Sequence, residues 1–268
     1  MAWSERGGLM IEVVIGGATG RLGSLVCALV QEQEDMRLAG AVVSDGSASV
    51  GCEVAPGVRA VGASRLSEAV EGADVYVDLT SPSAAEANLP RAARTDLDFV
   101  IGTTGISDGS LDSFRTALRE NNGSAVLASN FSVGVNVFFR TCEQLANALP
   151  GYDVEIVEVH HNKKKDAPSG TAREAANIIA KVAGIEEAVC GREGNVGARG
   201  KEIGIHSVRA GDVVGEHTVI FAGRKERIEL THRAHSREAF AEGCILAIRW
   251  VAGRRDGEVH NMREVLGI

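Results

Sequence analysis

The feature that most constrains this chain is a glycine-rich segment close to its start. A short apolar run at residues 11–15 is followed by GGATGRLG at residues 16–23, and then by apolar residues at helical spacing. Strand, glycine turn and helix in this order are what a pyrophosphate-binding loop needs. Gly17 allows the tight turn, Gly20 lets the backbone approach the phosphates, and Gly23 lets the helix pack close to the strand. We therefore expect a dinucleotide-binding unit, with a glycine-rich turn that binds nothing as the alternative.

An acidic residue follows the second predicted strand, which spans residues 38–43. Asp45 lies 22 residues beyond Gly23, near the position where a carboxylate accepts hydrogen bonds from the adenosine ribose hydroxyls. The same charge would repel the additional phosphate of NADPH, and no arginine follows this strand to offset the repulsion. Asp45 therefore favours NADH. Because aspartate before glycine is also an ordinary turn pair, a purely structural role for Asp45 stays open.

Strands and helices alternate through the rest of the first half. Three further strand-like runs are separated by helical patterns, at residues 75–79, 99–101 and 125–128. This alternation predicts an α/β fold with a Rossmann-type, doubly wound parallel sheet, whose ligands lie at the carboxyl ends of the strands. The loops that follow these strands are rich in small hydroxyl and amide groups, as a nicotinamide-ribose site would be; they are residues 80–82, 102–105 and 129–132.

The second half breaks this alternation. A helix is expected at residues 133–149 and a strand at residues 152–159. Three strand-like runs then occur close together, at 202–209, 213–221 and 227–232, and the turn signals between them imply antiparallel pairing. We expect a second α+β domain in which helices cover one face of an open mixed sheet. The uncovered face is the expected oligomer interface.

The strand at 152–159 leads into a strongly basic segment, HHNKKKDAPSGT at residues 160–171. It places two imidazoles and three ammonium groups ahead of a turn and of a helix that opens with the capping-box spacing of Thr171 and Glu174. A helix N-terminus attracts anions, and histidine supplies a proton donor that titrates near neutrality. The segment therefore predicts a site that holds and protonates a small anionic substrate. A solvated basic loop is the alternative.

No metal site is expected. His160 and His161 are adjacent, so on a strand they point to opposite faces and do not converge on one ion. His232 and His235 have a helical metal spacing, but they follow a strand-like run and lack a carboxylate partner.

Composition narrows the class of partner. The net charge of −8 and the aromatic content of 4% argue against binding to nucleic acid or to an anionic membrane. No apolar run approaches the ~20 residues of a membrane span. The five cysteines are scattered and never form a C-x-x-C pair, which favours reduced thiols in a cytoplasmic protein. The polar residues 1–9 are expected to be a dispensable extension or to precede an alternative start at Met10.

Taken together, these motifs resemble the dihydrodipicolinate reductases of lysine biosynthesis, now called 4-hydroxy-tetrahydrodipicolinate reductases. The resemblance covers nearly the whole chain in family order. It rests on GATGRLG at 17–23, GTTG at 102–105, SNFSVGV at 129–135, EVHH at 158–161, KKDAPSGT at 164–171, SVRAGD at 207–212 and GEHT at 215–218. The block from His160 to Thr171 is the most specific of these matches.

The resemblance implies a cytoplasmic homotetramer that uses NADH or NADPH to reduce a cyclic, unsaturated imine dicarboxylate. It also implies that the last helix returns to the nucleotide domain, so that residues 10–132 and 237–268 form one domain and residues 133–236 the substrate-binding and oligomerisation domain. Members of the family that use either cofactor often carry Glu-Arg just after the second strand, where this chain has Ser44 and Asp45, and this departure puts the cofactor preference in doubt.

Individual roles follow from the same resemblance. His160 resembles the proton donor, and Lys164 the cation that holds the substrate and assists proton transfer. The residues that match those binding the substrate carboxylates in the family are His161, Ser169, Gly170 and Thr171. The remaining matches are the implied cofactor contacts: Gly17, Ala18, Thr19, Gly20, Arg21, Leu22, Asp45, Thr80, Gly102, Thr103, Thr104, Ala128, Ser129, Asn130 and Phe131.

Two other classes compete with this hypothesis. One is a different dehydrogenase on a similar two-domain plan, such as an aspartate-semialdehyde or a sugar oxidoreductase. The aspartate-semialdehyde type would need a catalytic cysteine in a loop with a histidine partner, which none of the five cysteines offers. A nucleotide sensor of the atypical short-chain-dehydrogenase type shares the Gly-Ala-Thr-Gly motif. Such a sensor would have no use for the segment from His160 to Thr171.

Overall fold

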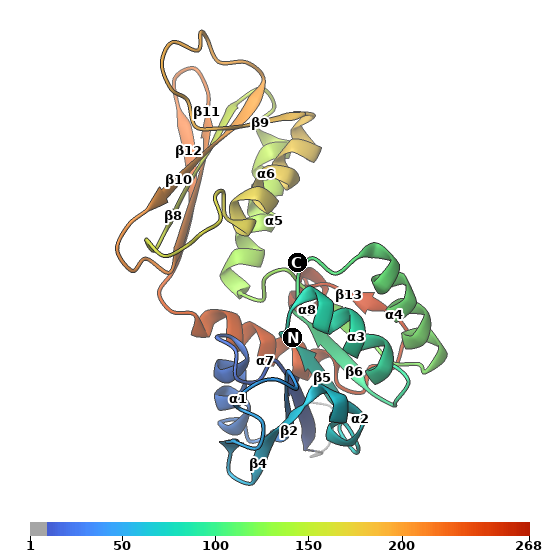
Figure 1. Cartoon of the computed structure of the whole chain (residues 1–268). Helices are drawn as coiled ribbons and strands as arrows, with labels where there is room; N and C mark the ends of the chain where they lie inside the picture. The colour runs from blue at the N-terminus through green and yellow to red at the C-terminus, as the bar shows by residue number, and fades with distance from the viewer. Residues whose placement is uncertain (1–9) are drawn as a thin grey trace. The chain divides into compact units, whose positions relative to one another are not determined.

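The computed structural model describes residues 10–268 and divides into two compact units (Figure 1). The first comprises the chain up to Ser132 together with Phe240–Gly267, and the second comprises Val133–Ala239. An eight-stranded sheet forms the centre of the first unit and a five-stranded sheet that of the second. The expectation about residues 1–9 lies outside the described residues.

The first unit alternates strands and helices along the chain. Its elements are β1 (Ile11–Gly16), α1 (Gly23–Gln31), β2 (Met36–Val43), β3 (Glu53–Ala55), β4 (Val58–Gly62), the 3₁₀ turn η1 (Ala63–Arg65), α2 (Leu66–Ala69), β5 (Val75–Asp78), α3 (Pro82–Ala92), β6 (Asp98–Ile101), α4 (Asp108–Glu120), β7 (Ala125–Leu127), nearly all of α7 (Glu238–Val251), β13 (Val259–His260) and α8 (Met262–Leu266).

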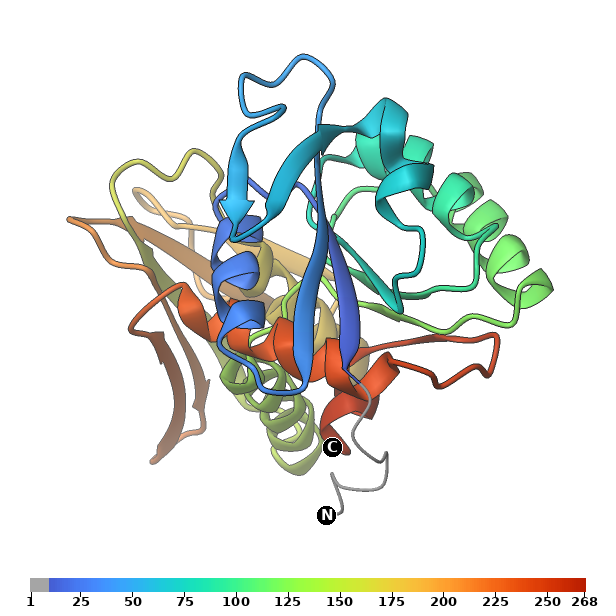
Figure 2. The same ribbon diagram turned by 90° about the horizontal axis from the view of Figure 1, so that it is seen from below.

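The sheet of the first unit is doubly wound, as predicted. Its strand order is β13-β7-β6-β5-β1-β2-β4-β3, and every neighbouring pair is parallel except β3 with β4. Val13 and Ile15 of β1 belong to the core that α1 and α7 cover, whereas Val14 belongs to the core on the opposite face, beneath α2, α3 and α4 (Figure 2). Alternate residues of a strand point to opposite sides of the sheet, and helices cover both sides, so both faces are buried.

The second unit contains two helices and five strands. They are α5 (Val133–Ala148), β8 (Asp153–His160), α6 (Gly170–Ala183), β9 (Glu187–Cys190), β10 (Glu202–Arg209), β11 (Gly215–Ala222) and β12 (Arg227–Ala234).

The mixed sheet of this unit was expected, but the expected pairing of its strands was partly wrong. The observed order is β12-β11-β8-β10-β9. β11 and β12 pair antiparallel, as predicted, whereas β10 pairs parallel with β8 and is not a neighbour of β11 in the sheet. Strand β8 lies between β10 and β11, the two runs that were expected to pair with each other. Turn signals report where strands end but do not report which strand fills the neighbouring position, so they did not reveal this insertion.

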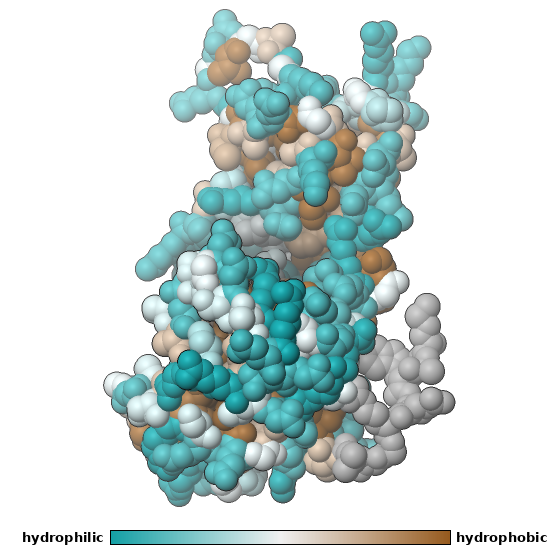
Figure 3. All heavy atoms as spheres, turned by 90° about the vertical axis from the view of Figure 1, so that its right-hand side faces the viewer, coloured by the Kyte–Doolittle hydropathy of each residue, from teal (hydrophilic) through white to brown (hydrophobic). Residues whose placement is uncertain are grey.

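Both helices of the second unit cover one face of its sheet. Val154 and Ile156 of β8 are buried with Phe138 of α5 and Ile179 of α6 in a single apolar core. Seen from the helix side, apolar residues lie among hydrophilic ones in this part of the molecule (Figure 3). On the other face, alternate residues such as Val157, Val159 and Ile220 are only half-buried, so the sheet is open there.

None of the helices between Met10 and Ile268 combines the length and the apolarity needed to cross a bilayer.

Candidate functional site

The glycine-rich loop follows β1 at the carboxyl edge of the eight-stranded sheet. Gly17 has a φ of +77°, and a Cβ atom there would lie 2.3 Å from the carbonyl oxygen of Leu79. A Cβ atom on Gly23 would lie 2.1 Å from the carbonyl oxygen of Gly17. Both positions therefore require glycine. Among the described residues no side chain caps α1 at Leu22, although the Ser24 amide donates to the Gly20 carbonyl at 2.9 Å. The start of α1 therefore presents a helix N-terminus that an anion such as pyrophosphate could approach.

A buried carboxylate, Asp78, joins the loops that follow β5 and β6. Its Oδ1 accepts hydrogen bonds from the hydroxyls of Thr80 at 2.8 Å and Thr103 at 2.5 Å, and the Thr103 hydroxyl oxygen accepts one from the Thr80 amide at 2.9 Å. Burial raises the pKa of Asp78, although these hydrogen bonds oppose the shift. The network holds Thr80 and Thr103 side by side beside the glycine loop.

The loop after β7 reaches the same edge of the sheet. A Cβ atom on Gly102 would lie 2.7 Å from the side chains of both Leu79 and Phe131, so the three loops are in contact. The structure thereby brings together most of the residues predicted to contact the cofactor. They are Gly17, Ala18, Thr19, Gly20, Arg21, Leu22, Thr80, Gly102, Thr103, Thr104, Ala128, Ser129, Asn130 and Phe131. This arrangement fits a dinucleotide, since glycine backbone lies beside α1 and hydroxyl groups lie beyond it.

Asp45 has a different set of partners. Its Oδ1 accepts hydrogen bonds from the amide of Ser64 at 3.0 Å and from the Ser64 hydroxyl at 2.7 Å. These bonds hold the pKa of Asp45 below its ordinary value. Arg91 of α3 donates to the carbonyls of Ala63 and Ser64 in the same loop, and its charge acts on Asp45. An arginine remote in sequence therefore stands near Asp45, which inspection of the residues after β2 did not reveal.

The basic segment begins where β8 ends, and a buried glutamate lies beneath it. Glu158 and His160 are both buried on the side of β8 that faces the helices, and His160 Nδ1 lies 2.5 Å from Glu158 Oε2. Arg209, the register partner of His160 on β10, donates to the two Glu158 oxygens at 2.9 and 2.8 Å. The amide of Ser169 donates to Glu158 Oε1 at 3.2 Å. One carboxylate thus links β8, β10 and the start of α6.

The charges of this cluster act on one another. Burial would raise the pKa of Glu158, but hydrogen bonds from Arg209, Ser207 and His160 lower it to about 2, so Glu158 is an anion at neutral pH. Burial lowers the pKa of His160, and the hydrogen bond and charge of Glu158 oppose that effect. Glu158 is therefore the group that favours the protonated imidazole.

The three lysines of the segment differ from one another. Lys164 is half-buried, and its Nζ lies 3.0 Å from Asp166 Oδ2. Lys163 and Lys165 are exposed. Arg209 donates to the backbone carbonyl of Asp166 at 2.7 Å, so the loop that carries Lys164 is tied to the same arginine that binds Glu158.

The predicted capping box at Thr171 was wrong. Helix α6 begins at Gly170, and its N-cap is Ser169, whose Oγ accepts a hydrogen bond from the Ala172 amide at 3.2 Å. The Ser169 hydroxyl also lies 2.9 Å from Nε2 of the buried His217. Gly170 and Thr171 form the first turn of the helix next to this cluster. His161 lies outside it, with Nε2 3.4 Å from an Arg237 guanidinium nitrogen.

Three residues of this cluster received no role in the sequence analysis. They are Glu158, Arg209 and His217, which belong to motifs shared with the family but were assigned no function. A two-residue period on β8 would have placed Glu158 on the same face as His160. No local signal could have brought Arg209 and His217 to it, because both come from other strands of the sheet.

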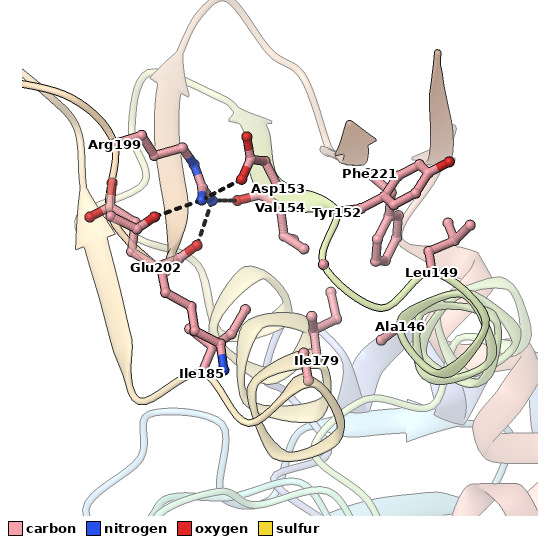
Figure 4. A pocket seen from close by; sticks show the side chains of 14 residues that line it. Ala146, Leu149, Tyr152, Asp153, Val154, Ile179, Ile185, Arg199, Glu202 and Phe221 are labelled. Atoms are coloured by element: carbon pink, nitrogen blue, oxygen red, sulfur yellow. Dashed lines mark hydrogen bonds and ion pairs between the residues drawn. The ribbon is translucent and has the colours of Figure 1, made fainter. Parts of the chain in front are cut away.

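A separate cavity of about 290 Å³ lies at the opposite end of β8 (Figure 4). Leu149, Ile179 and Phe221 contribute apolar walls. Arg199 lies at its rim and donates to the Asp153 carboxylate and to the backbone carbonyls of Val154 and Glu202. The carboxylates of Asp153 and Glu202 are paired with arginines, and Lys201 is the one further charged residue in the described lining. Among the described residues the cavity therefore holds no cluster of ionisable groups comparable to that around Glu158, which is the better candidate site of the second unit.

No group of three or more histidine, cysteine, aspartate or glutamate side chains within residues 10–268 is arranged to hold a metal ion. His232 lies on β12, next to Phe138, and not on a helix.

Comparison with known proteins identifies relatives for both units. Residues 11–131 match the family described as "Dihydrodipicolinate reductase, N-terminus", and residues 134–266 match "Dihydrodipicolinate reductase, C-terminus". The 4-hydroxy-tetrahydrodipicolinate reductase of Methanocaldococcus jannaschii is 47% identical over 270 residues, covering 97% of this chain and 98% of that protein. The enzyme of the same name from Methanopyrus kandleri is 47% identical over 267 residues, covering 96% of this chain and 97% of that protein.

Similar solved structures include a member of the same family. A dipicolinate-bound dihydrodipicolinate reductase from Paenisporosarcina sp. TG-14 is similar with a TM-score of 0.79 and 28% identity, covering 96% of this chain and 99% of that chain. At 14% identity and a TM-score of 0.61, the chain shares its fold with GenD2 of gentamicin A biosynthesis, solved in complex with NAD. That match covers 93% of this chain and 89% of that chain.

Proposed function

Since the chain belongs to the dihydrodipicolinate reductases, NAD(P)H-dependent oxidoreductases of lysine biosynthesis, we propose how its own residues carry out the reduction of 4-hydroxy-tetrahydrodipicolinate. The observation that carries the proposal is the strand-end cluster of the second unit. A buried, anion-supported imidazole lies there beside a half-buried ammonium group and the N-terminus of a helix.

The residues of the glycine loop and of the loops after β5, β6 and β7 would hold the cofactor. Reduced nicotinamide, when bound, supplies a hydride to an electrophilic carbon of the cyclic imine. The glycines would let the pyrophosphate approach the backbone and the N-terminus of α1 closely. Thr80 and Thr103, fixed by Asp78, offer hydroxyl groups for the nicotinamide ribose.

His160 is the proposed proton donor. Hydride addition displaces an electron pair onto the carbon adjacent to the reduced one, and that carbon must take up a proton. Protonated His160 supplies it from Nε2, because Nδ1 is bound to Glu158. The ring is then neutral and recovers its proton from solvent.

Lys164 and the start of α6 are the proposed grip on the substrate. The dicarboxylate carries two negative charges on a protein whose net charge is −8, so binding depends on local positive potential. Lys164 supplies one cation, and the N-terminus of α6, which begins at Gly170, supplies the positive end of a helix. Ser169 and Thr171 lie on either side of Gly170 at this end, and the Ser169 amide itself is bound to Glu158. His161 would reach a substrate carboxylate from the other side of the segment. The dipicolinate bound to the Paenisporosarcina enzyme has the same pair of carboxylates.

The proposal includes three finer points. NADH is favoured over NADPH because Asp45 is anionic at the end of β2. The protein is a homotetramer that assembles through the open face of the second unit's sheet. It works in the cytoplasm, with its five cysteines as free thiols. A purely nucleotide-sensing role would leave the cluster around His160 without a task.

The test is oxidation of NADH and NADPH by the purified protein, with and without the freshly made condensation product of pyruvate and aspartate semialdehyde. We expect oxidation only when the condensation product is present. His160→Gln should lower kcat by roughly 10²–10⁴ with a smaller effect on KM, because proton donation acts in the transition state. His235→Gln, which alters an exposed histidine, is the matched control and should leave turnover near normal. A His160→Gln variant with normal turnover would exclude His160 as the donor.

A further inference from the structure

We propose that Glu158 is the positioning residue of the reaction: it holds His160 with a proton on Nδ1, stabilises the imidazolium, and leaves Nε2 as the atom that releases the proton. This inference rests on the proposed role of His160 as donor. It adds a residue that does not touch the substrate and that acts through the histidine.

The hydrogen bonds of Glu158 determine which nitrogen of His160 carries a hydrogen. Its side chain is fully buried, and both oxygens are used, by Arg209 on one side and by His160 and the Ser169 amide on the other. An anionic carboxylate accepts hydrogen bonds and donates none. The Nδ1 atom of His160 must therefore carry a hydrogen in both the neutral and the charged ring.

The other ring nitrogen of His160 is left for chemistry. No hydrogen-bond partner for Nε2 is found among residues 10–268. A Cβ atom at Gly215 would lie 3.0 Å from Nε2, so a side chain at this position of β11 would crowd it. Loss of the proton from Nε2 leaves a neutral ring whose remaining hydrogen still points at Glu158, so the ring need not rotate between turnovers.

Charge balance explains why the ring needs an anion. The ionisable groups that face His160 are Glu158 on its own strand, Lys164 on the following loop, Arg209 on β10 and His217 on β11. His217 is neutral near pH 7, because burial lowers its pKa to about 3. Two cations and one anion therefore act on the imidazole. Without Glu158 both remaining charges would oppose its protonation.

Arg209 also links Glu158 to the loop that carries Lys164. It binds both oxygens of Glu158 and also the backbone carbonyl of Asp166, whose carboxylate pairs with Lys164. The orientation of His160 and the position of Lys164 thus depend on one guanidinium.

The experiment is the pH dependence of kcat in Glu158→Gln. Glutamine keeps a hydrogen-bond acceptor for Nδ1 but removes the charge. We expect the limb on which kcat falls with rising pH to move to lower pH by about one unit or more, with activity recovering in acid. Above that limb, kcat should drop roughly tenfold or more while KM changes less. A residue with only a structural role would lower activity equally at all pH values.

Glu155→Gln is the matched control. Glu155 lies on the same strand and is also held by arginines, Arg192 and Arg199, but on the opposite face of the sheet. Its replacement should leave the limb in place. If Glu158→Gln leaves the limb in place as well, the inference is wrong. If His160→Gln retains the limb, His160 is not the donor and the proposed function fails independently of Glu158.

A measurement on the wild-type protein tests the inference even if the Glu158→Gln variant does not fold. Histidine labelled with ¹⁵N reports which ring nitrogen carries hydrogen, and the His160 signals are assigned by their absence from His160→Gln. We expect neutral His160 to be the tautomer with hydrogen on Nδ1. A neutral ring with its hydrogen on Nε2 would overturn the inference.

Discussion

Lys164 differs from the two lysines beside it in burial and in partners. It is half-buried and pairs with Asp166, whereas Lys163 and Lys165 are exposed. We expect Lys164→Ala to lower kcat/KM by roughly 10- to 100-fold, because it removes a charge-assisted contact to the dianionic substrate. Lys163→Ala and Lys165→Ala are the controls and should be mild. Equal losses in all three variants, measured by NADH oxidation, would mean that the segment acts as a diffuse positive patch.

Asp45 and Arg91 act in opposite directions on the choice of cofactor. Asp45 would repel the 2′-phosphate of NADPH, and Arg91, which reaches the same loop, would weaken that repulsion. We expect a several-fold preference of the wild type for NADH in kcat/KM. Asp45→Ala should increase the relative use of NADPH, and Arg91→Ala should decrease it. If the ratio is unchanged in Asp45→Ala, the bonds to Ser64 are the whole role of Asp45 and it is only a turn residue.

Strand β11 brings a buried, neutral histidine into the core of the second unit. Burial lowers the pKa of His217 to about 3, whereas an unfolded chain binds a proton near pH 6.5. The unfolded state therefore takes up the proton first, so stability is complete above about pH 6.5 and decreases as the pH falls towards 3. At pH 5 the loss from this one group should be about 2 kcal/mol.

The measurement is the free energy of unfolding in denaturant between pH 7 and pH 5. His217→Gln should flatten its pH dependence in this range, and His235→Gln, at an exposed position, should not. The buried Glu158 acts in a different window. Its pKa is lowered to about 2, so its contribution is present above about pH 4.5 and is lost only below that value. A wild-type protein with constant stability from pH 7 to pH 5 would contradict the assignment of His217 as a buried neutral group.

The assembled protein is expected to be a homotetramer. The open face of the second unit's sheet carries half-buried apolar residues, among them Val157, Val159 and Ile220, and no element within residues 10–268 of the second unit covers them. A second copy of the chain would remove this surface from water. Light scattering at micromolar concentration should report four chains for the wild type and fewer for Ile220→Glu. Val50→Glu, an equivalent change at an exposed valine of the first unit, is the control and should leave the assembly intact. A monomeric wild type would refute the prediction.

Local patterns in the sequence were sufficient for the fold class and for several members of the site. The alternation of strands and helices predicted the doubly wound sheet, because a sheet covered on both faces imposes periodic apolar positions on each segment. Gly17 and Gly23 were identified because their positions in a strand–turn–helix tolerate no side chain. The basic segment was predicted as an anion site from the chemistry of its side chains and from its place at a strand end, and the resemblance to the family singled out His160 and Lys164 within it.

Only the tertiary structure decided which of these residues work together. Strand β8 lies between β10 and β11, so Arg209, 51 residues beyond Glu158, reaches the Glu158 carboxylate, and His217, 48 residues beyond Ser169, reaches the Ser169 hydroxyl. Arg91 likewise comes near Asp45 from a helix three strands further along the chain. A residue's periodicity reports which face it occupies but not which strand lies beside it. That choice is made by the packing of the complete sheet. The sequence therefore led to His160 as the predicted proton donor, but it did not reveal that the Glu158 carboxylate is held next to it by Arg209.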